Sequence, residues 1–86
     1  MTRQEISTVI QANIRMIVPG ADGQEIVEAK SMRDYGADSL MMVEIVSRSM
    51  KQLKIKVPRA KLLPVTNLKE LIDVFEEHAV QTVNQS

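Results

Sequence analysis

The stretch Tyr35-Gly36-Ala37-Asp38-Ser39-Leu40 is the point around which this 86-residue sequence is organised. Gly36 permits a tight turn, because it has no Cβ atom. Asp38 suits the N-cap position of a helix, where its carboxylate accepts a hydrogen bond from a first-turn N–H group. Ser39 then lies at the first helical position, with its hydroxyl beside the positive end of the helix dipole. The stretch therefore predicts a hydroxyl displayed at a loop–helix junction, as a nucleophile, a cap or an attachment point.

The apolar residues after Ser39 predict a helix from about Ser39 to Leu53, and they are too many for one core-facing stripe. Some of them must be exposed or face something other than the core, and exposed apolar side chains often mark a partner surface. We expect Leu40, Met41 and Val43 to form a partly exposed docking surface, and Met42 or Met50 to pack in the core. The apolar set comprises Leu40, Met41, Met42, Val43, Ile45, Val46, Met50 and Leu53.

A first helix is predicted at the N-terminus by the capping-box pattern that runs from Thr2 to Glu5. Pro19-Gly20 ends this helix. A long connection follows over residues 18–37, and a connection of this length with apolar anchors of its own is often functional. The apolar stripe of the helix comprises Ile6, Val9, Ile10, Ile14 and Ile17, and the expected anchors of the connection are Ile26, Val27 and Met32.

An extended linker and one helical turn are predicted after the second helix. The segment Lys54 to Pro58 alternates between cationic and apolar residues, so a strand is possible by pattern, but no partner strand is predicted. We interpret it as a linker whose Ile55 and Val57 pack inward. The segment Arg59 to Leu63 has room for a single helical turn, which Pro64 ends.

A last helix is capped by Thr66 or Asn67 and completes the predicted fold. The fold class is all-α, a bundle of three main helices plus one short helix with a long first loop. Residues 1–79 are expected to form the domain, and residues 80–86 a flexible C-terminal tail. The apolar stripe of the last helix comprises Leu68, Leu71, Ile72, Phe75 and Ala79.

Composition excludes several classes of function. The chain has no cysteine, which rules out disulfides, thiolate metal sites and a catalytic cysteine, and its one histidine leaves no His-rich metal site. A formal net charge of zero argues against a nucleic-acid binder. No apolar run approaches the roughly 18 residues that span a membrane, and the N-terminus does not resemble a secretory signal. We therefore expect a cytoplasmic monomer that binds no metal, nucleic acid or membrane.

The string Gly36-Ala37-Asp38-Ser39-Leu40, in an all-helical chain of this length, resembles the phosphopantetheine-attachment site of acyl carrier proteins. The resemblance extends to the first helix, the long loop, Val43-Glu44, the Val57-Pro58 linker and the final helix. It implies that a phosphopantetheinyl transferase moves 4'-phosphopantetheine from coenzyme A onto Ser39. It also implies a non-catalytic carrier, which holds acyl groups as thioesters and serves partners such as an acyltransferase or a ketosynthase.

Two acidic residues near Ser39 have roles that the resemblance suggests. A phosphodiester on Ser39 would lie near free N–H groups at the positive end of a helix, which favours an anion. Asp38 opposes this phosphodiester by charge, so we expect Asp38 to act as the cap and as a contact for the transferase. Glu44 matches the acidic residue that is common on this helix in the family. It is expected to contact basic partners, although ordinary solvation explains it equally well.

A run of basic residues departs from the pattern of fatty-acid carriers. The members of the resembled family that serve fatty-acid synthesis are typically strongly acidic. Partners with basic docking patches would be repelled here. A mixed solvated surface is one interpretation, and the other is a dedicated set of partners that contact Arg48 and Arg59, as in polyketide biosynthesis. Fatty-acid and peptidyl carriers stay open, and the Met1 start favours a free-standing carrier over an excised synthase domain. The run comprises Arg48, Lys51, Lys54, Lys56, Arg59 and Lys61.

Two other classes of protein compete with the carrier. The stretch around Ser39 is similar to part of a Gly-Asp-Ser-Leu hydrolase signature, but Ala37 interrupts it. A serine hydrolase also needs a base and an oxyanion hole. The one candidate base is His78, which we expect to be an exposed residue that interacts with the C-terminus of the last helix. The second alternative is an inert helical interaction module, in which Ser39 is only a solvated hydroxyl.

Overall fold

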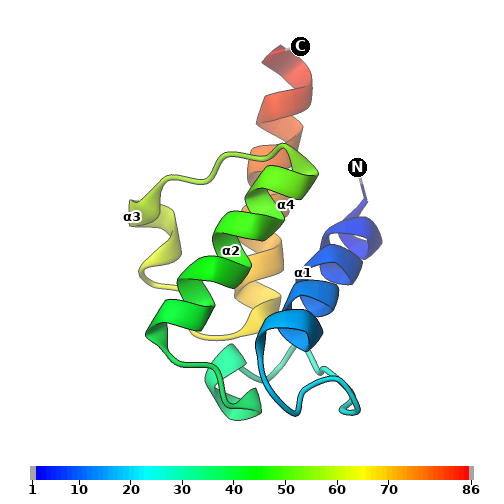
Figure 1. Ribbon diagram of the computed structural model, residues 1–86. Coiled ribbons are helices and arrows are strands. Elements are labelled where there is room, and N and C mark those ends of the chain that lie inside the picture. Colours follow the sequence, from blue (N-terminus) through cyan, green and yellow to red (C-terminus); the bar gives the residue numbers. More distant parts are fainter. Residues whose placement is uncertain (1, 86) are drawn as a thin grey trace.

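The computed structural model describes residues 2–85, and every regular element in that range is helical (Figure 1). It confirms the predicted all-α bundle of three main helices plus one short helix. One short 3-10 helix inside the long first loop was not predicted. The elements are α1 (Arg3–Ile17), the 3-10 helix η1 (Met32–Tyr35), α2 (Ser39–Leu53), α3 (Arg59–Leu62) and α4 (Leu68–Gln85).

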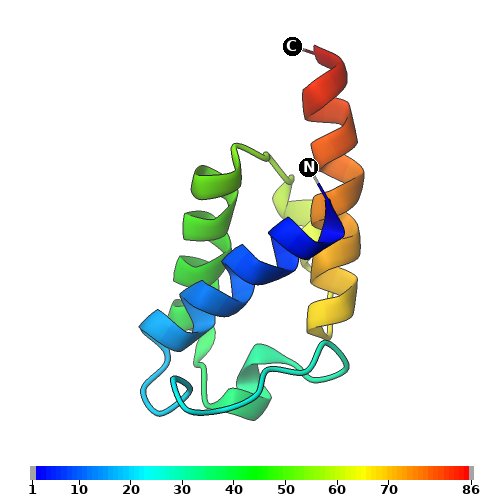
Figure 2. The same ribbon diagram turned by 90° about the vertical axis from the view of Figure 1, so that its right-hand side faces the viewer.

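The three long helices lie side by side, and the short α3 flanks α2 and α4 (Figures 1 and 2). α1 runs in the opposite direction to α2 and α4, and the long first loop passes beneath all three. The apolar stripes of these helices meet in one core. Full burial of each of the larger side chains contributes about 1.5–3 kcal/mol to stability. The innermost apolar side chains are Ile6, Ile10, Ile14, Ile45, Leu71, Ile72 and Phe75.

A buried polar contact fixes α1 against α2. The side-chain amide of Asn13 donates to Ser49 Oγ at 2.8 Å and to Gln52 Oε1 at 2.9 Å. A buried amide without such acceptors would be costly, so the two helices are held in one register. α1 itself begins as predicted, since Thr2 and Glu5 form the reciprocal hydrogen bonds of a capping box.

The first loop is attached to the bundle at several points, as its apolar residues predicted. Ile26 and Met32 are buried. Val27 is a correction, because its side chain is 40% exposed. Its backbone is held instead: its N–H donates to the Tyr35 hydroxyl at 2.6 Å, and its carbonyl oxygen accepts from the N–H of Lys30 at 3.0 Å. A one-residue step along an extended segment turns the next side chain away from the core, which explains why Ile26 and Val27 differ.

The loop is also attached to the start of α4. The N–H groups of Leu68 and Lys69 donate to carbonyl oxygens of Lys30 and Glu28 at 3.0 and 2.8 Å. The Arg3 side chain connects the N-terminus of α1 to the first loop and to α4 by ion pairs with three carboxylates. These belong to Glu28 at 3.1 Å, to Asp73, and to Glu76 at 3.7 Å.

The linker after α2 packs as predicted, with Ile55 and Val57 buried. α3 is the expected single turn.

The start of α4 is capped by two side-chain hydrogen bonds. Asn67 Oδ1 accepts from the N–H of Glu70 at 2.8 Å, and the Glu70 carboxylate accepts from the N–H of Thr66 at 2.7 Å. Both of the residues considered as caps therefore take part.

α4 differs from the sequence-based expectation in two respects. His78 was expected to be exposed, but it is 8% exposed, and its Nδ1 lies 2.9 Å from the carbonyl oxygen of Val74. Position 78 follows Phe75 by three residues, so it shares the core-facing stripe. The helix also extends past Ala79 to Gln85. That residues 80–86 form a flexible tail stays a prediction, because their side chains lie outside the described residues.

Candidate functional site

The loop before α2 is shaped by two local features. The Ser31 hydroxyl accepts from the N–H of Asp34, and the Asp34 carboxylate accepts from the N–H of Ser31, so η1 begins with a capping box. Gly36 then ends η1 with a φ of 98°, in the left-handed region that favours glycine. This sharp turn reverses the chain and leads directly into Ala37, which is buried, and Asp38.

Asp38 is the N-cap of α2. Its backbone is extended, and its Oδ1 accepts a hydrogen bond from the N–H of Met41 at 2.8 Å. A cap of this kind satisfies one of the N–H groups that the first turn of every helix leaves without an intrahelical acceptor. It therefore fixes where α2 begins, and it sets Ser39 as the first residue of the helix.

Ser39 is exposed, and its hydroxyl lies beside a cation. Arg33 Nη2 donates to Ser39 Oγ at 3.4 Å, from η1 across the Gly36 turn. Sequence reasoning missed Arg33. The signal that would have found it is the pattern Ser31-x-x-Asp34, a capping box that announces a short helix ahead of the turn.

The surroundings of Ser39 do not form a nucleophile-activating site among residues 2–79, whose side chains the structure describes. The one side chain hydrogen-bonded to its hydroxyl there is Arg33, and a guanidinium does not act as a base. His78 points to a carbonyl oxygen within its own helix, α4. Among the described residues, no group of three or more histidine or carboxylate side chains is arranged to hold a metal ion. None of the helices described there is long and apolar enough to cross a membrane.

An apolar surface continues along α2 directly after Ser39. Leu40 is 77% exposed and Val43 is 62% exposed, whereas Met41 is half-buried. Met42 and Met50 are half-buried against the core. Folding leaves most of the surface of Leu40 and Val43 in contact with solvent, so this apolar surface is available to a partner.

The charged residues predicted as partner contacts all follow Ser39 in the sequence, and they are divided between α2 and α3. Glu44 and Arg48 are exposed on α2, and Arg59 is exposed at the first position of α3. None of the three forms an ion pair with another described residue. The structure thus leaves these side chains in solvent, and it groups Glu44 and Arg48 with the apolar surface by the four-residue spacing of one helix face.

The junction fits a phosphate group attached to the Ser39 hydroxyl. The hydroxyl is exposed, it lies at the first residue of a long helix, and the first-turn N–H groups and the helix dipole favour an anion there. Arg33 adds a positive charge at hydrogen-bond distance. The Asp38 carboxylate is engaged by the N–H of Met41, which offsets part of its repulsion toward a phosphate.

Comparison with known proteins defines the class. The phosphopantetheine attachment site family matches residues 12–75, which include the Asp38-Ser39 junction and most of the bundle. The chain is also 34% identical over 75 residues to the polyketide biosynthesis acyl carrier protein AcpK of Bacillus subtilis, a match that covers 87% of this chain and 92% of the relative. The chain therefore belongs to the phosphopantetheine-attachment family of acyl carrier proteins, which are non-catalytic carriers that work with partner enzymes.

Two further comparisons agree with this assignment. An acyl carrier protein homolog of Ureaplasma parvum is 35% identical over 51 residues, which covers 59% of this chain and 62% of the relative. In a crystal structure of the HMG synthase of the curacin biosynthetic pathway in complex with acetyl donor-ACP, one chain superposes with a TM-score of 0.79. That chain is 28% identical, and the match covers 87% of this chain and 96% of the other.

Proposed function

We propose that the chain carries 4'-phosphopantetheine covalently on Ser39 and serves as an acyl carrier protein of polyketide-type biosynthesis. The observation that carries the proposal is the exposed Ser39 hydroxyl at the first residue of α2, in a chain of the phosphopantetheine-attachment family. The similarity to AcpK, a carrier of polyketide biosynthesis, supports the pathway. A cytoplasmic location and a monomeric state stay predictions from the sequence.

The attachment is a group transfer in which the Ser39 Oγ–phosphorus bond forms and the pyrophosphate bond of coenzyme A breaks. The nucleotide part of coenzyme A is the leaving group. The proton of the Ser39 hydroxyl must pass to a base on the transferase, because the described residues of this chain place no base beside it. This chain contributes the position of the hydroxyl, through the Asp38 cap, and positive potential, through Arg33 and the start of α2.

Once attached, the arm supplies a terminal thiol that holds acyl groups as thioesters. The chain's own side chains then determine which enzymes approach. The apolar contact next to the arm is formed by Leu40, Met41 and Val43. Leu40 and Val43 are exposed in the free chain, so their apolar surface is buried only when a partner binds. Glu44, Arg48 and Arg59 are the charged contacts around it. Such exposed charges influence the rate of encounter and the choice of partner more than the final affinity.

The basic run supports a dedicated set of synthase partners. Its cations would repel an enzyme whose docking patch is basic and attract one whose patch is acidic. Reversal of Arg48, Lys51 and Arg59 to glutamate is therefore expected to slow acyl transfer by the native partner while the bundle stays folded, because all three side chains are exposed. Equal transfer rates for the wild type and the charge-reversed variant would show that the run is a solvated surface with no part in partner binding.

Mass spectrometry tests the attachment. The chain is incubated with coenzyme A and a broad-specificity phosphopantetheinyl transferase. The wild type is expected to gain the mass of one phosphopantetheine, and Ser39→Ala is expected to gain none. Ser47→Ala is the matched control, since Ser47 is also an exposed serine on α2. No mass gain in the wild type with several transferases would contradict the proposal.

A further inference from the structure

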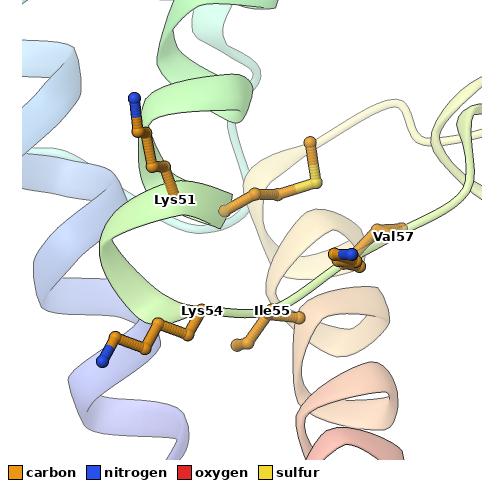
Figure 3. Close-up of a pocket in the computed structure, with 6 residues that line it drawn as sticks. Lys51, Lys54, Ile55 and Val57 are labelled. Atoms are coloured by element: carbon orange, nitrogen blue, oxygen red, sulfur yellow. The ribbon is translucent and has the colours of Figure 1, made fainter.

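A groove of about 510 Å³ lies at the C-terminal end of α2, where the helix passes into the linker (Figure 3). Its base is formed by half-buried Met50 and by buried Ile55 and Val57. Its rim carries lysines. In Figure 3, Lys51 and Lys54 extend on the α2 side with their nitrogen atoms directed away from Ile55 and Val57. We call this the lysine groove, and it is lined by Met50, Lys51, Lys54, Ile55, Lys56 and Val57.

The lysine groove lies far from the attachment point. Ser39 begins α2 and Leu53 ends it, and a helix rises 1.5 Å per residue. The two ends are therefore about 20 Å apart, and Figure 1 shows them at opposite ends of the bundle. A partner that occupies the groove would not cover Ser39 with the same segment.

The net charge of zero conceals a strong separation of charge. Residues 48–61 hold six cationic side chains and no acidic one, so the rest of the chain, with five cations and all eleven acids, carries a net charge of −6. No cation of this run forms an ion pair with another residue between 2 and 79, where the ion pairs all involve Arg3 or Lys69. The groove is thus a localised source of positive potential.

Ordinary helix stabilisation accounts for only part of this charge. Lys51 lies in the last turn of α2, where a cation complements the helix dipole. Lys56 lies in the linker, and Arg59 and Lys61 lie within α3, a helix of only four residues. Lys54 is the C-cap that follows α2, and its φ of 58° is a left-handed conformation that glycine adopts with less strain. A lysine is therefore held where folding alone favours glycine.

The shape of the groove indicates a protein partner. Its apolar residues are recessed, with Ile55 and Val57 buried, while the cations project. A membrane surface is bound by apolar side chains that protrude into it, together with cations. A recessed apolar base with a cationic rim instead suits a protein partner. An apolar side chain of the partner enters the groove, and carboxylates on either side of that side chain contact the rim.

We propose that the lysine groove is a second docking site, which binds an acidic amphipathic segment of a partner protein by one or two inserted apolar side chains and by carboxylates that contact Lys51, Lys54 and Lys56. This goes beyond the carrier function, because it requires neither the arm nor Ser39. It anchors a synthase component at one end of α2 while the other end stays accessible.

The test uses a synthetic helical peptide with a leucine stripe flanked by glutamates, titrated into the ¹⁵N-labelled full chain. Amide shift changes are expected to centre on residues 50–57, and to be the same in Ser39→Ala, which separates this outcome from that of the attachment. Affinity is expected to fall as salt is raised, since exposed charges are screened within about 10 Å at 0.1 M ionic strength. A control peptide with lysine in place of each glutamate is expected not to bind.

Charge-removing variants give the matched comparison. Lys54→Gly suits the left-handed backbone at that position, so it removes a rim charge without strain. Lys54→Gly and Lys56→Gln are each expected to weaken peptide binding roughly 2- to 5-fold. Lys30→Gln, which removes an exposed lysine of the first loop, is expected to leave binding unchanged.

Several results would overturn the proposal. These are no binding of the acidic peptide at millimolar concentration, equal binding of the lysine peptide, or shift changes that centre on Leu40 and Val43. Equal effects of Lys54→Gly and Lys30→Gln would also overturn it. Vesicles that contain phosphatidylglycerol serve as the last probe, and if they shift residues 50–57 more strongly than the peptide does, the groove is a lipid-binding surface instead.

Discussion

Arg33 and Ser39 are six residues apart in the sequence, yet Arg33 Nη2 lies 3.4 Å from Ser39 Oγ. The turn at Gly36, with its left-handed backbone, brings the two side chains together. A positive charge therefore stands beside the hydroxyl that is proposed to receive a phosphate. This contact gives Arg33 a role in the attachment reaction that can be measured separately from the fold.

Replacement of Arg33 by glutamine is expected to lower kcat/KM for phosphopantetheine transfer roughly 2- to 5-fold, as expected for an exposed charge contact. The reason is loss of positive potential next to the phosphate that is transferred. The loss should shrink as salt is raised. Arg33→Lys is expected to retain most of the rate, and Arg15→Gln, an arginine of α1, all of it. An unchanged rate in Arg33→Gln at low salt would show that the contact has no part in the reaction.

Asp38 is expected to combine a structural and a recognition role, and two substitutions separate them. Asp38→Ala removes the acceptor for the N–H of Met41 and should lower the free energy of unfolding by about 1 kcal/mol. Asp38→Asn keeps a cap of similar quality, so the free energy of unfolding should stay near that of the wild type. Urea unfolding measures both. If the transferase modifies Asp38→Asn as fast as the wild type, the carboxylate is a cap and not a transferase contact.

The apolar surface of α2 is expected to contribute to partner recognition without contributing to stability. Leu40→Ser and Val43→Ser should change the free energy of unfolding by less than about 0.5 kcal/mol, because both side chains are exposed. Both should slow acyl transfer by a synthase partner. Ile45→Ala, on the same helix but fully buried, should cost about 2–5 kcal/mol instead. Wild-type transfer rates in both serine variants would remove these residues from the docking surface.

The ion pairs of Arg3 predict a specific dependence of stability on pH. The hydrogen bond from Arg3 lowers the pKa of Asp73 below its usual 3.8. A carboxylate with a lowered pKa stabilises the fold above its unfolded pKa, and the contribution is lost as the pH falls through the folded value. Wild-type stability should therefore decline below about pH 4.

Arg3→Gln should remove that part of the decline and should cost roughly 0.2–1 kcal/mol at neutral pH, since the partners are substantially exposed. Urea unfolding at a series of pH values measures the effect. Parallel curves for the wild type and Arg3→Gln would contradict the assignment to Asp73.

Much of the bundle follows from local patterns in the sequence. The caps at Thr2 and Asn67 and the helical spacing of the apolar residues determine where α1 and α4 begin and which face each buries. The Asp38-Ser39 junction was predicted from the same cap chemistry. These features depend on residues three or four positions apart, a range over which helix geometry fixes the contacts.

The features that sequence reasoning missed depend on irregular backbone or on packing. The contact of Arg33 with Ser39 requires the turn at Gly36, and the lysine groove requires α2 to meet an extended linker at Lys54. His78 was assigned to the surface because of its residue type, although its position places it on the buried stripe of α4. Imidazole has an apolar body that packs in a core when a ring nitrogen finds a partner, as here at the carbonyl of Val74.

The measurement that tests the central claim most directly is localisation of the attached group by tandem mass spectrometry. After modification with coenzyme A and a transferase, trypsin should release residues 34–48, a peptide that contains the two serines Ser39 and Ser47. The account predicts that fragment ions assign the whole added mass to Ser39 and none to Ser47. Assignment of the added mass to Ser47, or to any other residue while Ser39 stays unmodified, would contradict it.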